Sequence, residues 1–438
     1  MRVAVASAKE GRSEAFQDFK WALGLNRLSL RLMGVWPNER DLDEELTSVT
    51  FRVPAMIATI SLCLFLPQMY ALVLVFNELP LVIDNLVTSC SALTSCVKLY
   101  FVWRSKTLLW PVVESVKCDW LRPKRSWERE AMKREAARAR LFTISGYVVL
   151  AGCYSGFAFA PLFGINIRMI SNITDYGDRL LMVQSYLPYD YSKSPAYEIT
   201  QTSQLIAGFF IGMAVSIPDN YYAALVFHVS AQFEILGDRI ERFIKTDPAA
   251  ETFSSDIDFQ RSVGVFIDRH VHLIALVLRL TIKIIHSSYL DYCRLVTAVE
   301  ESFNFVIAAQ ILCMSVVVCC LGFQILGIIG GNEDKPSLLQ IVTLVGTLFT
   351  LMMHTLVDCF ASETLASRSS GFFHNVYNCK WYTIPQYDTR LLIPMMLLSK
   401  IPRKLTAGKI FHLSLSTYCN ILKSTASYIS MLLVASGR

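Results

Sequence analysis

The sequence predicts an all-α integral membrane protein with seven transmembrane helices, its N-terminus cytoplasmic and its C-terminus extracellular. The 438 residues are 53% hydrophobic with a mean hydropathy of +0.41, and 18% are charged, against about 25% in soluble domains. The charges are gathered in blocks, and the apolar runs between them reach the roughly 20 residues that a helix needs to cross hydrocarbon. The runs lack alternation with a period of two residues, which favours helices over a barrel.

Seven apolar runs are long enough to span. We expect them at about residues 53–76, 81–103, 141–167, 199–227, 302–329, 337–357 and 410–434. The second contains Asp84 and Lys98, the seventh contains Lys423, and the fourth is expected to be interrupted at Pro218-Asp219.

Two other segments are apolar only in part and are not expected to span. Residues 264–299 carry Arg279, Lys283, Asp291 and Arg294, and a charge at the centre of a span costs a few kcal/mol on insertion scales. We therefore expect an amphipathic helix outside the membrane core. Residues 391–398 form an apolar run that is too short to cross.

The distribution of Lys and Arg predicts the orientation. The arm before the first span and the segments after the second, fourth and sixth spans carry 34 of these residues, and the opposite side carries five. Positive charge stays in the cytoplasm, so the N-terminus is inside and an odd span count puts the C-terminus outside. The sequon Asn172-Ile173-Thr174 falls on the expected outer side, which makes Asn172 a candidate glycosylation site.

The sequence carries no catalytic constellation, so we expect no enzyme, no cofactor and no metal. His270 and His272 are two residues apart on an expected helix and point away from each other. A Gly-rich phosphate loop and a Gly-x-Ser-x-Gly turn are both missing. The basic block 122–140 lies beside a membrane, which favours contact with anionic lipid headgroups over a nucleic acid.

Small residues in the third and fourth spans allow two interpretations. Gly152 and Gly156, and likewise Gly208 and Gly212, form Gly-x3-Gly patterns that allow close helix packing. The same patterns leave room for a small apolar ligand beside aromatic and methionine side chains. These side chains are Tyr147, Tyr154, Phe157, Phe209 and Met213.

The seventh span combines small hydroxyl residues with an apolar end, Met431-Leu-Leu-Val434. A polar-lined helix that ends in a hydrophobic ring is typical of a gate that closes by dewetting. The alternative is a helix that packs against its own bundle, with its hydroxyl groups bonded across the interface.

Three motifs resemble those of a known family. The longest begins with Trp381-Tyr382 and Arg390-Leu-Leu392, and continues from Leu405-Thr-Ala-Gly408 through Leu413-Ser-Leu-Ser-Thr-Tyr418 to Ile421-Leu-Lys423 and Ser427-Tyr428. The others are residues 227–236 (FHVSAQFEIL) and 320–324 (CLGFQ). With them the C-terminal half resembles the insect odorant receptor family. Ser424-Thr425 stands where the related gustatory receptors have Gln-Phe, which favours the odorant branch.

The resemblance implies a ligand-tuned subunit, rather than the shared co-receptor, of an odorant-gated non-selective cation channel in the plasma membrane. Its partners would be a co-receptor subunit in a heterotetramer, a small volatile ligand and membrane lipid, with no nucleic acid. The chain would divide into a cytoplasmic arm (1–52), spans one to six with the ligand-binding bundle (53–361), a cytoplasmic anchor (362–409) and a pore-lining span (410–438).

The resemblance also implies site residues. Position from the chain end matches Met431, Val434 and Ala435 to the pore constriction, although the co-receptor has glutamine and leucine where this chain has Val434 and Ala435. The partner subunit would then set the gate of a mixed channel. The odorant would bind in the outer half of spans two, three, four and six. Its candidate contacts are Asn85, Thr88, Ser89, Tyr147, Leu150, Tyr154, Phe209, Met213, Thr347 and Leu351.

Three other classes of membrane protein are alternatives. A gustatory-type receptor channel would share the topology. A G-protein-coupled receptor would need its N-terminus outside, and this sequence lacks both Asp-Arg-Tyr after span three and Asn-Pro-x-x-Tyr in span seven. A secondary transporter would show repeated halves with paired helix interruptions, and Pro218-Asp219 has no counterpart.

Overall fold

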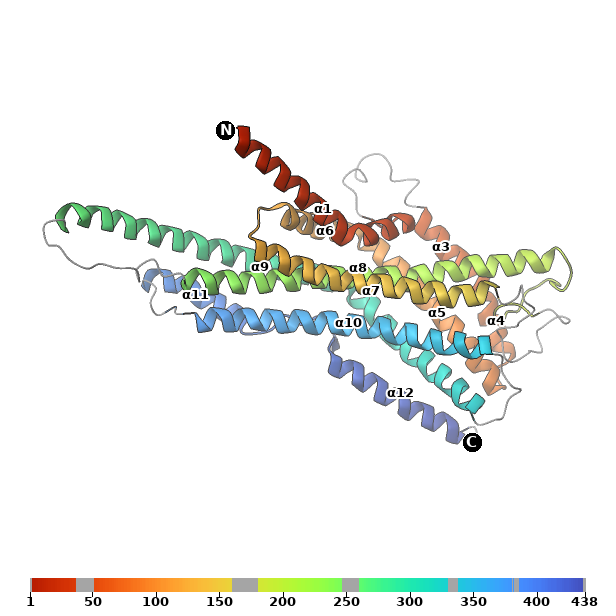
Figure 1. The fold of residues 1–438 in the computed structure, drawn as a ribbon. Helices are drawn as coiled ribbons and strands as arrows, with labels where there is room; N and C mark the ends of the chain where they lie inside the picture. The colour runs from red at the N-terminus through yellow and green to blue at the C-terminus, as the bar shows by residue number, and fades with distance from the viewer. Residues whose placement is uncertain are drawn as a thin grey trace.

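The computed structural model describes residues 2–36, 51–159, 180–245, 260–329, 338–379, 381 and 386–435. These residues form an elongated helical bundle with one short hairpin (Figure 1). Its elements are α1 Arg2–Met33, α3 Arg52–Ile60, η2 Ser61–Phe65, α4 Leu66–Leu74, α5 Leu79–Arg104, α6 Lys106–Leu121, α7 Ser126–Phe159, α8 Ala196–Lys245, α9 Gln260–Ile329, α10 Leu338–Asn378, α11 Gln386–Ser399, β1 Thr406–Ala407, β2 Phe411–His412 and α12 Leu415–Ala435.

Within the described residues, six helices are long and apolar enough to cross a membrane. They are Arg52–Leu74, Leu79–Arg104, Ser126–Phe159, Ala196–Arg242, Leu280–Ile328 and Gln340–Asn378. Each overlaps one of the first six expected spans. The outer faces of these helices carry exposed apolar side chains such as Val73, Val148 and Leu312, which suit a lipid environment.

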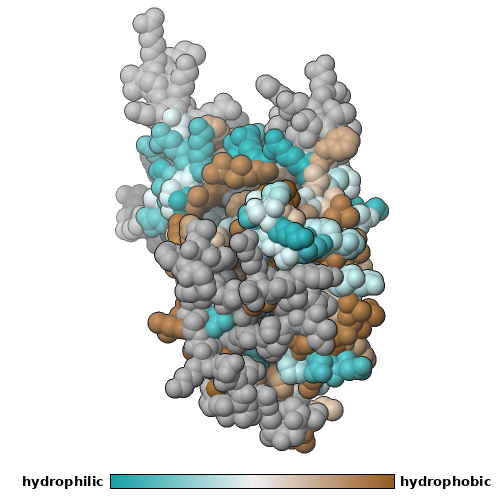
Figure 2. All heavy atoms as spheres, turned by 90° about the vertical axis from the view of Figure 1, so that its right-hand side faces the viewer, coloured by the Kyte–Doolittle hydropathy of each residue, from teal (hydrophilic) through white to brown (hydrophobic). Residues whose placement is uncertain are grey.

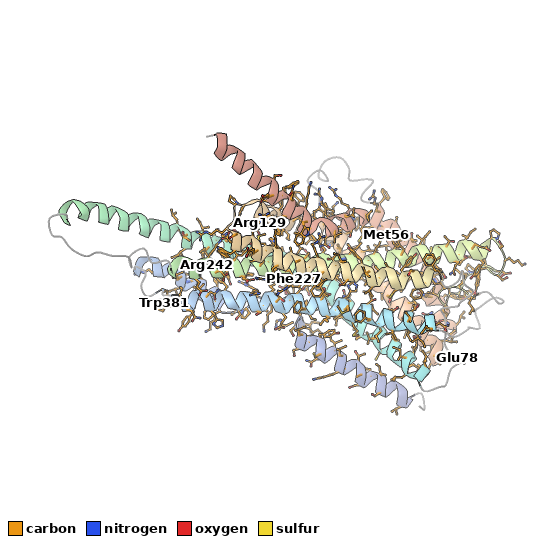
Figure 3. All side chains as sticks on the ribbon, in the orientation of Figure 1. Met56, Glu78, Arg129, Phe227, Arg242 and Trp381 are labelled. Carbon is orange, nitrogen blue, oxygen red and sulfur yellow. The ribbon has the colours of Figure 1, made fainter. Side chains whose placement is uncertain are left out.

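Four helices are much longer than a membrane is thick. At about 1.5 Å per residue, the 50 residues of α8 extend about 75 Å, whereas hydrocarbon is about 30 Å thick. The helices α7, α8, α9 and α10 therefore run along the length of the bundle and continue beyond its apolar part (Figure 1). Glu78 marks one end of the bundle, and Arg242 and Trp381 lie toward the other (Figure 3).

The first span contains a π-helical turn, η2, between α3 and α4. Pro67 lies at the start of α4 and has no N–H to donate. The N–H of Leu66 instead reaches the carbonyl of Ser61, five residues back. The span therefore continues through its proline as a single helical rod.

The expected interruption at Pro218-Asp219 is wrong, because α8 continues through both residues. A proline inside a helix leaves carbonyls of the preceding turn without their usual donors. Here the Nζ atom of Lys98 on α5 donates to the carbonyl oxygen of Val215 at 2.9 Å. A neighbouring helix thus supplies a donor to the turn before the proline, as is common in membrane helices.

Two boundaries also differ from the expectation. Residues 264–299 are helical as predicted, but they continue without a break into the fifth span as part of α9. The seventh helix begins at Leu415, not at residue 410, because residues 406–412 form the hairpin of β1 and β2. Gly408 and Lys409 make its turn with φ angles of 64° and 57°, a left-handed conformation that glycine adopts freely. The short run 391–398 lies in α11, which has 14 residues.

The main apolar core surrounds the middle of α8. Phe227, labelled in Figure 3, is fully buried and packs between Phe142 of α7 and Phe360 of α10. On the opposite flank of α8, Tyr222 contacts Phe303 of α9. These aromatic contacts hold α8 as the central helix against which the cavity described below is built.

Candidate functional site: a cavity and the buried charges below it

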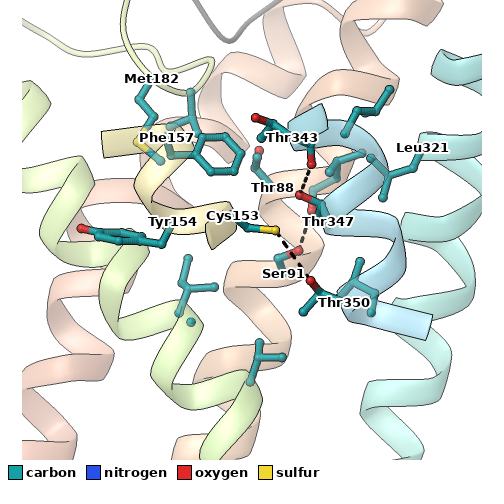
Figure 4. Close-up of a pocket in the computed structure, with 18 of the residues that line it drawn as sticks. Thr88, Ser91, Cys153, Tyr154, Phe157, Met182, Leu321, Thr343, Thr347 and Thr350 are labelled. Atoms are coloured by element: carbon teal, nitrogen blue, oxygen red, sulfur yellow. Dashed lines mark hydrogen bonds between the residues drawn. The ribbon is translucent and has the colours of Figure 1, made fainter. Parts of the chain in front are cut away.

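A cavity of about 260 Å³ lies toward the end of the bundle that holds Glu78 (Figures 3 and 4). Figure 2 shows this end of the bundle face-on, with hydrophilic and hydrophobic residues mixed across it. The walls come from η2, α4, α5, α7, α8, α9, α10 and the segment 182–184. The lining includes Leu64, Gln68, Asp84, Thr88, Ser91, Leu150, Cys153, Tyr154, Phe157, Met182, Gln184, Gly208, Gly212, Val215, Leu321, Gln324, Gln340, Thr343, Thr347, Thr350 and Leu351.

The cavity has an aromatic side and a side lined by threonines (Figure 4). Tyr154 and Phe157 come from α7, and Tyr154 packs edge-on against Phe209 at 5.8 Å between ring centroids. On α10, the hydroxyls of Thr347 and Thr350 donate to carbonyls one turn back, each at 2.8 Å. Bonds of this kind occupy the hydroxyl hydrogens. The α10 wall therefore offers fewer free donors than its composition suggests.

The positions of the fourth-span glycines are compatible with both interpretations, close helix packing and room for a ligand. A Cβ atom at Gly212 would lie 3.1 Å from Leu150, so its absence lets α7 approach α8 closely. Gly208 and Gly212 also line the cavity, so the same absence leaves room there. In the third span, a Cβ atom at Gly156 would lie 3.3 Å from the hydroxyl oxygen of Thr343. Gly152 is exposed, and a Cβ atom there would meet no described atom within 4 Å.

Half of the predicted ligand contacts line this cavity, namely Thr88, Leu150, Tyr154, Thr347 and Leu351. The other half lie outside its lining. Asn85 and Ser89 are buried on an adjacent face of α5, where Ser89 donates to the carbonyl of Asn85 at 2.9 Å. Tyr147 lies deeper on α7 and donates to Ser29 of α1 at 2.7 Å.

The remaining two predicted contacts lie on α8 beside the lining residues. Phe209 is half exposed and reaches the cavity only through Tyr154, and Met213 packs against the main core. Successive helix positions differ by about 100°, so residues 208, 211, 212 and 215 face the cavity while 209 and 213 turn away. The helices that carry the predicted contacts all border the cavity, but the rotation of α8 turns these two positions away from it.

Buried charges lie directly below the cavity. Lys98 of α5 donates to Asp219 of α8 at 2.7 and 2.9 Å, and both side chains are almost fully buried. Nδ1 of His354 on α10 lies 3.3 Å from the same carboxylate. Gln310 of α9 donates to Asp219 at 3.1 Å and to Asp358 at 3.2 Å. We call Lys98, Asp219, Gln310, His354 and Asp358 the buried polar cluster.

Partial signals for this cluster are visible in the sequence. Lys98 and Asp219 stood out as charges within expected spans, and such charges commonly pair with each other inside a bundle. The pairing of two residues 121 positions apart, however, depends on how α5 packs against α8. The cluster joins four helices, and Val215, whose carbonyl accepts from Lys98, lines the cavity.

The last helix, α12, lies at the edge of the bundle (Figure 1). It packs on α9 and α10 through Thr425 and its neighbours. Its opposite face is exposed along a stripe with a spacing of three and four residues, formed by Ser416, Asn420, Lys423, Ser427, Ser430 and Val434. Of the predicted pore residues, Met431 and Val434 are exposed, and Ala435 ends the helix. Asn172 lies outside the described residues.

Three proteins of Drosophila melanogaster are similar to this chain. Putative odorant receptor 85d is 22% identical over 255 residues, which cover 58% of this chain and 54% of that protein. Odorant receptor 13a is 22% identical over 257 residues, covering 56% and 55%. The chain thus spans about half the length of these two relatives. Odorant receptor 10a is 21% identical over 420 residues, covering 92% and 93%.

Solved structures share the fold. The insect olfactory receptor OR5 from Machilis hrabei, in complex with eugenol, superposes with a TM-score of 0.76 at 16% identity. The match covers 96% of this chain and 100% of that one. A second structure of the same receptor gives a TM-score of 0.74 at 15% identity, covering 96% and 99%.

A family model described as 7tm Odorant receptor matches residues 78–426, which are most of the chain. Its description gives seven spans, and α12 supplies the seventh beside the six apolar helices named above. The family model identifies a multi-pass receptor of the sensory neuron membrane and not an enzyme, and the solved structures show the same fold. The chain therefore belongs to the odorant receptor family.

Proposed function

We propose that this chain is the ligand-tuned subunit of an odorant-gated, non-selective cation channel, which it forms together with a co-receptor subunit. The observation that carries the proposal is the cavity of about 260 Å³ inside a chain of the odorant receptor family. A molecule there is surrounded by helices that also hold the buried polar cluster, so its binding can change how these helices pack.

The cavity suits a small volatile molecule. Engineered apolar cavities of about 150 Å³ take up benzene, so about 260 Å³ has room for a molecule of about ten non-hydrogen atoms. Tyr154, Phe157, Met182 and Leu150 offer it an apolar and polarisable surface. We assign the ligand contacts to the lining residues Thr88, Leu150, Tyr154, Thr347 and Leu351.

The pore is assigned to α12. Its exposed stripe is polar from Ser416 to Ser430 and apolar at Val434, and it faces away from the chain's own bundle. Four such stripes around a common axis would form a wet pathway with a hydrophobic constriction at Met431, Val434 and Ala435. Residues 362–409 would supply the main subunit contacts, and residues 1–52 the cytoplasmic arm.

Coupling between ligand and pore would pass through helix packing. A ligand changes the equilibrium between closed and open states only through its differential affinity for them. Leu351 and Thr350 line the cavity, and His354 of the buried polar cluster lies one turn further along α10. The same helix contacts α12 through Met352, whose Sδ atom accepts from Tyr418 at 3.8 Å. A shift of α10 therefore moves parts of all three sites.

Current recordings test this proposal. The full chain is expressed with and without a co-receptor, and a panel of volatiles is applied while G-protein signalling is blocked. We expect currents with a reversal potential near zero that appear within milliseconds and persist under the block. Currents that vanish under the block would contradict the channel assignment.

A further inference from the structure

The segment 180–186 holds one glutamine against the cavity. This segment is fixed to α8, because the N–H of Met182 donates to Gln201 at 3.1 Å and Gln204 donates to Ser185 at 3.1 Å. It is also fixed to α4, because the N–H of Tyr186 donates to the carbonyl of Pro67 at 3.1 Å. Gln184 lies between these anchors, lines the cavity and is 1% exposed.

Both polar atoms of the Gln184 amide lack a hydrogen-bond partner among the described residues. An amide side chain carries two N–H donors and a carbonyl oxygen with two lone pairs. Burying such a group without partners costs about 1–3 kcal/mol. The position of Gln184 at the wall of a cavity therefore indicates a missing partner inside that cavity.

Gln68 contributes a second free acceptor to the same cavity. Its Nε2 atom donates to Thr88 at 2.8 Å, while its Oε1 atom is buried and has no partner among the described residues. Thr88 in turn donates its only hydroxyl hydrogen to the carbonyl of Asn85 at 3.1 Å. Thr88 can therefore only accept a hydrogen bond from Gln68. The amide nitrogen of Gln68 must then face Thr88, and the amide oxygen of Gln68 is the atom without a partner among the described residues.

Among the described residues, the buried lining atoms without a hydrogen-bond partner thus comprise the amide nitrogen of Gln184 and the carbonyl oxygens of Gln184 and Gln68. An ether, ester or ketone oxygen can only accept, so it could satisfy the nitrogen of Gln184 alone. A hydroxyl group both donates and accepts, so it could satisfy the nitrogen and one of the two oxygens. We infer that the cavity is built for an apolar molecule that carries one hydroxyl group, an alcohol or a phenol, with Gln184 as the specificity-determining residue.

This inference rests on the proposed function and names the ligand class of its site. The rest of the lining includes apolar side chains such as Leu64 and Met182, and polar ones that already have partners, such as Thr347 and Asp84, which accepts from Gln324 at 3.4 Å. A ligand with a single polar group at one end therefore matches the cavity better than one with several. The hydroxyl would lie at the segment 182–184 and the apolar part would extend toward Leu351 and Val215.

Isomeric ligand pairs test the inference on the unmodified chain. In each of two pairs, 1-octanol with 1-methoxyheptane and 2-phenylethanol with benzyl methyl ether, only the alcohol can donate a hydrogen bond. With the co-receptor present, we expect the alcohol of at least one pair to be more potent than its isomer. Its half-maximal concentration should be lower by a factor of about ten or more. Equal potencies within both pairs would overturn the inference.

Two substitutions locate the effect. Gln184→Leu keeps the approximate volume and removes both polar atoms, so the ratio between alcohol and ether should fall to near one. Thr202→Val is the control, because Thr202 is exposed on α8, lies outside the cavity lining, and its hydroxyl already donates to the carbonyl of Glu198 within its own helix at 2.7 Å. In this control the ratio should stay as in the unmodified chain. Gln184→Met repeats the test in case Gln184→Leu does not reach the cell surface.

The outcomes separate this inference from the proposed function. If both members of each pair evoke equal currents, the channel function stands and the hydroxyl preference falls. If Gln184→Leu and Gln184→Met reach the surface and keep the full preference, Gln184 is not its source and the inference is equally overturned. If no volatile evokes a current from a surface-expressed complex, the proposed function itself fails.

Discussion

Lys98 and Asp219 form an ion pair in the interior of the bundle, with Nζ lying 2.7 Å from Oδ1 and 2.9 Å from Oδ2. The side chains are 0% and 4% exposed, so neither charge reaches solvent or lipid in this structure. Charged groups within membrane spans are rare, and they generally pair inside the bundle. The pair ties α5 to α8 just below the cavity. Lys98 also donates to the carbonyl of Val215, in the turn before Pro218.

Removing one partner of this pair should destabilise the protein strongly. Lys98→Met leaves the Asp219 carboxylate buried without its main counter-charge, which costs about 3–5 kcal/mol in comparable buried pairs. We expect a large fall in the thermal unfolding midpoint of the detergent-solubilised protein. The double variant Lys98→Met/Asp219→Asn removes both charges and should recover part of the loss.

An exposed ion pair provides the control for this experiment. Arg294 and Asp291 are 81% and 61% exposed and lie 3.4 Å apart, and such surface pairs contribute about 0–1 kcal/mol. Arg294→Met should leave the midpoint nearly unchanged. A fall of similar size in both single variants would argue against a special role for the buried pair.

Filling the cavity should weaken the ligand response without preventing folding. Gly212→Val places two methyl groups at the wall, where even a Cβ atom lies 3.1 Å from Leu150. We expect the half-maximal ligand concentration to rise about tenfold or more. Added methyl groups in a well-packed site typically cost about 1–3 kcal/mol, which the bound state would have to bear. Dose–response curves at matched surface expression measure this.

Gly152→Ala is the matched control for the glycine experiment, since Gly152 is exposed and no described atom lies within 4 Å of an added Cβ. Its dose–response curve should match that of the unmodified chain. An unchanged response in Gly212→Val would mean that the ligand binds elsewhere.

Ligand should protect one particular cysteine from alkylation. Cys153 lines the cavity, with its Sγ atom 3.7 Å from Oγ1 of Thr350 (Figure 4). A small membrane-permeant maleimide should label it in the free protein and more slowly at saturating ligand. Cys118 on α6 is exposed and should be labelled at the same rate in both conditions. Peptide mass spectrometry distinguishes the two sites, and equal protection of both would contradict binding in the cavity.

Cysteine substitutions should show whether the α12 stripe faces a pore. In a background with Cys419→Ser, a charged methanethiosulfonate applied during activation should reduce the current through Ser427→Cys and Val434→Cys. Both side chains belong to the exposed stripe. Thr425→Cys is the control, because Thr425 is 3% exposed and faces α9, where Cys319 donates to its carbonyl. Inhibition only at Thr425→Cys would remove α12 from the pore wall.

Hydropathy alone located the spans with useful accuracy but not their ends. The first six expected runs each overlap a described apolar helix, because length and apolar content depend only on local composition. Helix ends depend on neighbours instead. Pro218 does not break α8 because Lys98 arrives from another helix, and residues 410–414 leave the seventh helix because the chain pairs with itself at Ala407 and Phe411.

The residues of the candidate site were likewise only partly predictable from the sequence. Residues such as Tyr154 and Thr347 were identified because aromatic and small polar residues in a span are visible in the sequence. Gln184 was missed because it lies in a connecting segment, where no periodicity indicates which side chains turn inward. Its importance depends on partners that it lacks among the described residues, and only packed coordinates reveal this.

By itself, the sequence determined that the chain is a helical membrane protein with about seven spans, and its C-terminal motifs indicated the family. These properties follow from composition and order along the chain, since hydrocarbon requires every spanning backbone to satisfy its own hydrogen bonds. The tertiary structure decided which face of each helix borders the cavity, and it brought Lys98, Asp219 and His354 together from three helices. Such contacts depend on the rotation and packing of whole helices, which no local stretch of sequence specifies.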